Sequence, residues 1–185
     1  MTILAFSSSG SSKSINRQLV AEVLTHFQGH DIDFVNLLDY DMTIYNKDKE
    51  LDQGIPDKAM EFATRIDRAD LIIISMAEHN GAYTALFKNL FDWVSRIPGR
   101  KAFADKKMFL LGTSPGALGA SNVLGIAAAR FPRNGGHVLE TFSLPSFEEN
   151  FKPGEGITDP AKRGELLEKI DKVKASINKV KASII

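Results

Sequence analysis

Two stretches of the chain are apolar without interruption, and they constrain the fold more than any other feature of the sequence. Within the runs at residues 71–75 and 108–112, residues 71–74 and 108–111 are apolar at every position. Such runs are typical of strands buried on both faces, as in parallel sheets covered by helices. Residues 2–6 and 32–35 are further short apolar runs, and residues 137–144 form a weaker fifth. The sequence therefore predicts five strands in a mostly parallel sheet.

Helical patterns separate these runs. Residues 15–27 carry apolar side chains four positions apart, on one face of a helix. Comparable spacing recurs at residues 56–66, 84–94 and 120–131, and a last helix is expected to begin where Asp159 can cap it. Strand and helix thus alternate five times. This predicts the α/β class, as a flavodoxin-like three-layer sandwich with a five-stranded parallel sheet in the order 2-1-3-4-5.

Composition narrows the class of protein further. The 185 residues are 43% hydrophobic, which suits one globular domain spanning residues 1–185. The 23 basic residues balance 23 acidic ones, so neither nucleic acid nor a membrane surface is an expected partner. The absence of cysteine excludes disulfides and thiolate chemistry, and suits a reducing cytoplasm. Residues 37–55 and 145–158 are expected to be irregular connections.

The loop after the first predicted strand is rich in hydroxyl groups. Residues 7–16 read SSSGSSKSIN, and a helix is expected to begin at the end of this stretch. Free N–H groups and the positive end of the helix dipole favour an anion there. The same residues could instead form a capped, flexible turn. The spacing matches neither the triphosphate-binding nor the dinucleotide-binding glycine motif, whereas binding of a monophosphate remains open.

Two more loops are expected at the same edge of the sheet, where ligands bind in such folds. Residues 76–83 crowd polar groups around an Asn80-Gly81 pair that suits a tight turn. His79 has no neighbouring ligands at metal-binding spacing, so no metal site is expected. Residues 113–119 contain Gly116 and Gly119, which let the backbone lie flat against a planar ligand. Each loop alone is compatible with a simple turn, but together they indicate a phosphorylated planar cofactor.

These segments resemble the NAD(P)H-dependent FMN reductases of flavodoxin-like fold, a family that includes quinone, azo-dye and chromate reductases. Residues 78–83 (EHNGAY) followed by residues 88–93 (KNLFDW) are similar to the family's P-E-Y-N-G-S-Y and K-N-x-x-D-W stretches. Residues 9–17 are similar to its G-S-x-R-x-x-S-x-N-R phosphate loop. The resemblance covers residues 2–151. Ser11 and His79 stand where the family usually has arginine and tyrosine.

The resemblance implies FMN as cofactor and NADPH or NADH as co-substrate. It implies electron transfer to a small acceptor, such as a quinone, a flavin, an azo compound or a metal oxyanion, in a homodimer or homotetramer. No catalytic side chain is expected, because the cofactor carries the redox chemistry. The residues implied to bind the cofactor are Ser9, Ser11, Ser14, Ile15, Asn16, Ala77, Glu78, His79, Asn80, Gly81, Ser114, Pro115, Gly116 and Gly119.

Two alternatives remain open. The first is an FMN-binding electron carrier, although such carriers are generally strongly acidic and this chain has no net charge. The second is a flavin-dependent sensor or interaction module without turnover. Its support is the last predicted helix, whose apolar residues recur at spacings of three and four and suit either the sheet or a partner helix. These residues are Leu166, Ile170, Val173, Ile177 and Val180.

Overall fold

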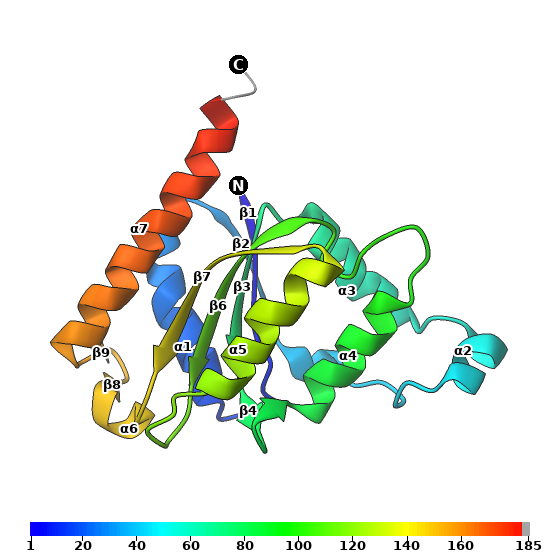
Figure 1. The fold of residues 1–185 in the computed structure, drawn as a ribbon, viewed down its shortest axis with the longest axis horizontal. Helices are drawn as coiled ribbons and strands as arrows, with labels where there is room; N and C mark the ends of the chain where they lie inside the picture. Colours follow the sequence, from blue (N-terminus) through cyan, green and yellow to red (C-terminus); the bar gives the residue numbers. More distant parts are fainter. Residues whose placement is uncertain (183–185) are drawn as a thin grey trace.

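A five-stranded parallel sheet forms the centre of the computed structural model, which describes residues 1–182 (Figure 1). Its order is β2-β1-β3-β6-β7, so the strand order reverses between β1 and β3. All four strand pairs are parallel. The strands are β1 (Thr2–Ser7), β2 (Asp31–Val35), β3 (Leu71–Met76), β6 (Lys106–Thr113) and β7 (Gly136–Leu144). The predicted strands, their order and the flavodoxin-like class are confirmed.

Helices cover both faces of this sheet (Figure 1). One face packs against α1 (Ile15–Leu24) and α7 (Pro160–Ala182), and the other against α3 (Asp57–Arg68), α4 (Ala85–Ser95) and α5 (Ser121–Arg130). Every residue of β3 is buried, as its continuous apolar run predicts. No helix within the described residues is both long and apolar enough to cross a membrane. Short 3-10 helices follow α1, β2 and α5, at Thr25–Phe27, Leu37–Tyr40 and Phe131–Asn134.

The last helix packs on the sheet of its own chain. Leu166, Ile170, Val173 and Ile177 are all buried in the core that α7 shares with α1 and the sheet. The side chain of Val180 lies outside the described residues. The repeating apolar face of this helix is therefore used within the chain, over the part that the structure describes.

The two expected irregular connections both contain regular structure, which corrects the sequence reading. Within residues 37–55, α2 (Lys47–Gln53) begins at Asn46, whose side chain accepts a hydrogen bond of 2.7 Å from the amide of Asp48. Within residues 145–158, a short helix α6 (Phe147–Asn150) precedes a hairpin of β8 (Phe151–Lys152) and β9 (Gly156–Ile157). Elements this short show too little periodicity to be recognised in sequence.

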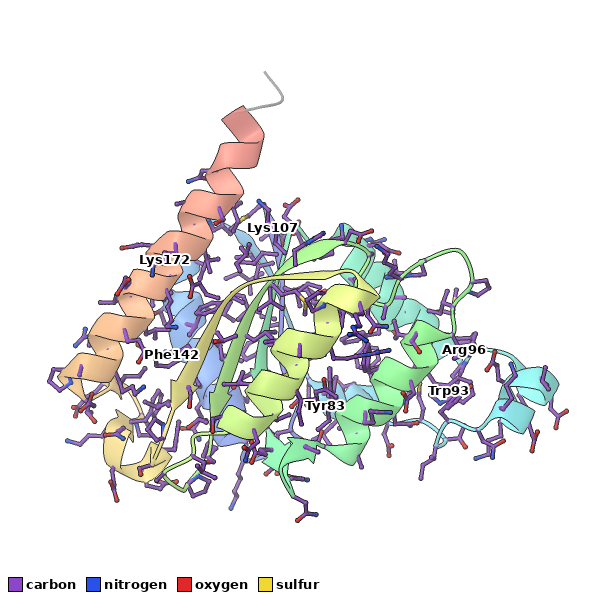
Figure 2. All side chains as sticks on the ribbon, in the orientation of Figure 1. Tyr83, Trp93, Arg96, Lys107, Phe142 and Lys172 are labelled. Atoms are coloured by element: carbon purple, nitrogen blue, oxygen red, sulfur yellow. The ribbon has the colours of Figure 1, made fainter. Side chains whose placement is uncertain are left out.

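The segment around α2 forms an arm that stands away from the sheet and is anchored to α4 (Figures 1 and 2). The indole N–H of Trp93 donates to the carbonyl of Thr43 at 2.8 Å, and its ring meets the Tyr45 ring edge-on. Arg96 donates two hydrogen bonds to Glu50. Hydrogen bonds from Arg96, Tyr45 and a nearby lysine lower the pKa of the Glu50 carboxyl to about 2. Trp93 therefore has a structural role, because it holds the arm against α4.

Candidate functional site

A groove of about 280 Å³ lies at the carboxyl ends of β1, β3 and β6, beside the reversal of strand order. All three loops singled out in the sequence contribute to it. Its lining residues are Ser9, Ser11, Lys13, Ser14, Ile15, Asn16, Ala77, Glu78, His79, Thr113, Ser114 and Pro115. Four of the expected positions, Asn80, Gly81, Gly116 and Gly119, do not line it. We call this space the inner groove.

The start of α1 presents free donors to the inner groove. Ser14 caps the helix, because its hydroxyl accepts from the amide of Arg17 at 3.1 Å and pairs with the hydroxyl of Ser7. The amides of Ile15 and Asn16 occupy the first helical positions and have no acceptor within residues 1–182. Unpaired amides at a helix start attract an anion. The predicted anion cradle therefore has its donors in place.

The serines before this helix hold the loop in successive tight turns. The amide of Ser9 donates to the hydroxyl of Ser7, the amide of Ser11 to Ser9, and the amide of Lys13 to Ser11, at 3.1 to 3.2 Å. Side-chain hydroxyls thus take the place of backbone acceptors in a segment with no regular structure. The loop is ordered by its own side chains, and its hydroxyls remain next to the groove.

Asn16 uses its side chain to link the start of α1 to two strands, β3 and β6, which differs from the expected ligand contact. Its Oδ1 atom accepts from the Ser75 hydroxyl at 2.7 Å and from the Thr113 amide at 3.2 Å. Its Nδ2 atom donates to the Thr113 carbonyl at 3.1 Å. The residue is 4% exposed, so these contacts are shielded from water. Only its backbone amide is available to an anion.

Ser8 connects the loop after β1 to the loop after β3. It is fully buried, and its hydroxyl accepts from the amide of Ala77 at 2.7 Å. Its carbonyl accepts from the hydroxyl of Thr84, which caps α4. Ser8 is therefore a structural link between β1 and the loop after β3.

The second loop is a hairpin of β4 (Glu78–His79) and β5 (Ala82–Tyr83). Asn80 and Gly81 both have positive φ, as the predicted tight turn requires. His79 is exposed and lines the inner groove. Glu78 differs from expectation, because its carboxylate accepts from the Val123 amide at 2.9 Å and from Asn122 at 3.1 Å. It caps α5 and holds the hairpin against that helix.

Tyr83 belongs to the core rather than to the polar cluster expected at this hairpin. Its ring lies between α4 and α5, where it packs against Phe87, Phe91 and Phe131 (Figure 2). Its hydroxyl is buried and has no hydrogen-bond partner among the described residues. Burial raises the pKa of Tyr83 to about 12.

The third loop is tied to the segment after β7. The carbonyl of Ser114 accepts from the amide of Phe147, and the carbonyl of Gly116 accepts from the amide of Ser146. Gly119 has a φ of +54°, and a Cβ there would lie 2.8 Å from the nitrogen of Pro145. Packing within the chain therefore requires this glycine. A Cβ on Gly116 would meet nothing within 4 Å.

Two lining residues were not predicted. Lys13 brings an exposed ammonium group to the serine loop, and Thr113 ends β6 beside Asn16. The signal for Lys13 was visible, because it is the one cation among the hydroxyls of residues 7–16. Thr113 could be placed only by the sheet register. Within residues 1–182 no three histidine, aspartate or glutamate side chains cluster as metal ligands.

Comparisons with known proteins agree with this geometry. The family profile described as NADPH-dependent FMN reductase matches residues 1–149. The NADH:(hydroxy)cinnamate reductase subunit of Vibrio ruber is 30% identical over 122 residues, covering 65% of this chain and 57% of that protein. The 2-hydroxy-1,4-benzoquinone reductase of a Burkholderia species is 33% identical over 110 residues, covering 58% and 57%. The chain thus spans little more than half the length of these relatives.

Solved structures show the same fold. The flavoenzyme NAD(P)H:(acceptor) oxidoreductase of Paracoccus denitrificans superposes with a TM-score of 0.76 at 24% identity, covering 96% of this chain and 97% of that one. The NAD(P)H:quinone oxidoreductase of Methanothermobacter marburgensis gives 0.63 at 20% identity, covering 93% of each. The expected fold is thereby confirmed, and FMN and NADPH are the molecules named in the description of the matching family profile. The chain belongs to the NADPH-dependent FMN reductase family.

Proposed function

We propose that this protein is an oxidoreductase that passes electrons from NADPH or NADH, through bound FMN, to a small acceptor. The observation that carries the proposal is the inner groove, which joins the unpaired amides of Ile15 and Asn16 to two further loops at the switch point of the sheet. FMN, when bound, supplies a ring that accepts a hydride and passes the electrons on. The chain supplies the position and the charge.

The residues at the two ends of the groove fit the two ends of FMN. The hydroxyls and backbone amides of residues 9–16 would hold its phosphate. The segments 77–79 and 114–115 would flank its ring. Open space beside Gly116 leaves room on the side of the third loop. We propose no catalytic side chain.

The open groove supports a small planar acceptor. None of its lining residues is a phenylalanine, tyrosine or tryptophan, so no large aromatic side chain lines the place proposed for the ring. Nicotinamide and acceptor would occupy the same face in turn, which predicts ping-pong kinetics. The two relatives above, a (hydroxy)cinnamate reductase subunit and a benzoquinone reductase, support a quinone or a related conjugated molecule as acceptor, with flavins, azo compounds and metal oxyanions as further candidates. His79 borders this face and would influence the choice of acceptor.

The decisive experiment starts with flavin binding. Titration with FMN and with FAD, followed by fluorescence quenching, should show tighter binding of FMN. Stopped-flow mixing of the FMN-loaded protein with NADH or NADPH should then bleach the flavin absorbance, and a quinone should restore it. Binding without bleaching would favour the carrier or sensor alternative. If neither flavin binds, the proposal is wrong.

We further propose a homodimer or homotetramer in which the arm around α2 lies at the subunit contact. Ile44 and Leu51 on this arm are 76% and 71% exposed, the two highest values among the large hydrophobic residues described. An anchored arm with exposed apolar side chains suits an interface. Sedimentation should give an oligomer, and Leu51→Glu should shift it towards the monomer. A monomeric wild type would contradict this proposal.

The extent of the FMN-binding domain can also be proposed. We propose that residues 1–185 act as one FMN-binding domain, which is supported by the two core clusters that share one sheet within residues 1–182. Residues 183–185 lie outside the described structure.

We also propose a cytoplasmic location, because reduced nicotinamides are found inside cells and the composition suits a reducing compartment. Fractionation with a tagged protein would test this.

A further inference from the structure

A second cavity lies on the other side of the serine loop from the inner groove. It has a volume of about 270 Å³ and shares Lys13 and Ser14 with the inner groove. We call it the outer cavity. Its lining residues are Ser12, Lys13, Ser14, Arg17, Gln18, Ala21 and Phe34. None of the residues proposed to flank the flavin ring reaches it, so the proposed binding of FMN leaves this cavity unused.

The outer cavity is positively charged and has an aromatic wall. The guanidinium carbon of Arg17 lies 4.0 Å from the centre of the Phe34 ring, and one of its N–H groups donates to the carbonyl of Val35. The remaining N–H groups are available to a ligand. Neither Arg17 nor Lys13 forms an ion pair within residues 1–182. Two unneutralised cations and a stacked planar pair therefore meet in one cavity.

The acidic residues nearest in sequence do not neutralise these cations. Asp33 precedes Phe34 on β2, but its carboxylate pairs with Arg65 of α3 on the opposite face of the sheet, at 2.6 Å. Glu22 of α1 does not line the cavity, and its carboxylate lies beside Gly156 in β9. The positive charge of the outer cavity is thus left for a bound anion.

We propose that the outer cavity binds the phosphorylated adenosine half of NADPH, with Arg17 and Lys13 holding its 2′-phosphate. A phosphate monoester carries nearly two negative charges at pH 7 and accepts the forked N–H groups of arginine. The planar Arg17–Phe34 pair offers a surface on which a purine stacks. This inference rests on the proposed function, because the nicotinamide half of the same molecule must reach the flavin in the inner groove.

The arrangement assigns a source of preference between the two nicotinamides. NADH lacks the 2′-phosphate and would leave the charge of Arg17 and Lys13 unused. NADPH would gain at least one charge-assisted hydrogen bond, which corresponds to about a ten- to hundredfold difference in affinity. The two cavities meet at Lys13 and Ser14, so one extended dinucleotide would cross the serine loop there.

Calorimetry with nucleotide fragments tests this site apart from turnover. FMN-loaded protein is titrated with adenosine 2′,5′-bisphosphate and, separately, with adenosine 5′-monophosphate. We expect the bisphosphate to bind at least tenfold more tightly, and less tightly as NaCl is raised. Arg17→Gln should remove most of this difference, whereas Arg17→Lys, which keeps the charge, should retain part of it. Equal binding of the two nucleotides, or an unchanged Arg17→Gln variant, would overturn the proposal.

Controls separate this site from the fold and from the flavin. Arg163→Gln is the matched control, because Arg163 is an exposed residue of α7 that lines neither cavity, and it should bind as wild type. Lys13→Gln is a second test in case Arg17→Gln does not fold. It removes no side-chain hydrogen bond seen among the described residues, and it should also weaken binding of the bisphosphate. In steady state, Arg17→Gln should lower kcat/KM for NADPH relative to NADH. If FMN does not bind, the proposed function fails, and the same titrations on the flavin-free protein still decide this inference.

Discussion

Replacing Asn16 with alanine should destabilise the fold, because this side chain joins the start of α1 to β3 and β6. The variant loses three buried hydrogen bonds, two to Thr113 and one to Ser75. Each contributes about 0.5–1.5 kcal/mol net, and the groups left without partners are shielded from water. Alanine recovers about 0.5 kcal/mol through its better helix propensity. We expect a loss of about 2–4 kcal/mol in the free energy of unfolding.

Urea unfolding of the flavin-free protein measures this loss, with far-UV circular dichroism and the fluorescence of the single tryptophan as probes. Asn122→Ala is the matched control, because Asn122 occupies the same second position of α5 but is exposed and makes one hydrogen bond, to Glu78. That control should lose less than about 1 kcal/mol. FMN binding should weaken in Asn16→Ala but not in Asn122→Ala. Without the Asn16 side chain, the start of α1 and the unpaired amides of Ile15 and Asn16 are no longer fixed to β3 and β6. If both variants unfold at the same urea concentration, Asn16 is not a link between strands.

Three further perturbations test other contacts. Gly119→Ala should cost about 1–3 kcal/mol, since its φ is positive and its Cβ would meet backbone, whereas Gly116→Ala should leave stability unchanged in the same thermal melts. Tyr83→Phe should stabilise by about 1 kcal/mol by removing an unpartnered buried hydroxyl. Its advantage should grow above pH 10, where the unfolded wild-type tyrosine ionises and the folded one, with a pKa of about 12, does not. Ionised Glu50 stabilises the arm at pH values above its ordinary pKa of 4.5, and this stabilisation is lost as the pH falls towards 2. Because the arm contacts Trp93, the tryptophan emission should shift to the red in that pH range. In Arg96→Gln this emission shift should occur at a higher pH. If wild type and variant give the same curve of emission against pH, the Arg96–Glu50 pair does not stabilise the arm.

Much of the architecture follows from local patterns. The uninterrupted apolar runs at residues 71–74 and 108–111 predicted strands buried on both faces, and the alternation with helical patterns predicted the sheet order. These features are legible because burial on both faces demands apolar side chains at every position of a strand. The same reasoning located the three loops of the inner groove, because the carboxyl ends of parallel strands share one edge.

Which atoms in those loops are free for a ligand was decided only by the tertiary structure. Asn16 was predicted to face the cofactor, yet its side chain is bound to Thr113, 97 residues further along the chain. Glu78 is likewise engaged by the start of α5, and Gly119 is required by packing against Pro145. A polar residue in a loop shows what it can donate or accept, but its partner depends on which distant backbone groups the fold leaves unpaired beside it. Those groups are set by the register of β1, β3 and β6, which no local pattern in the chain encodes.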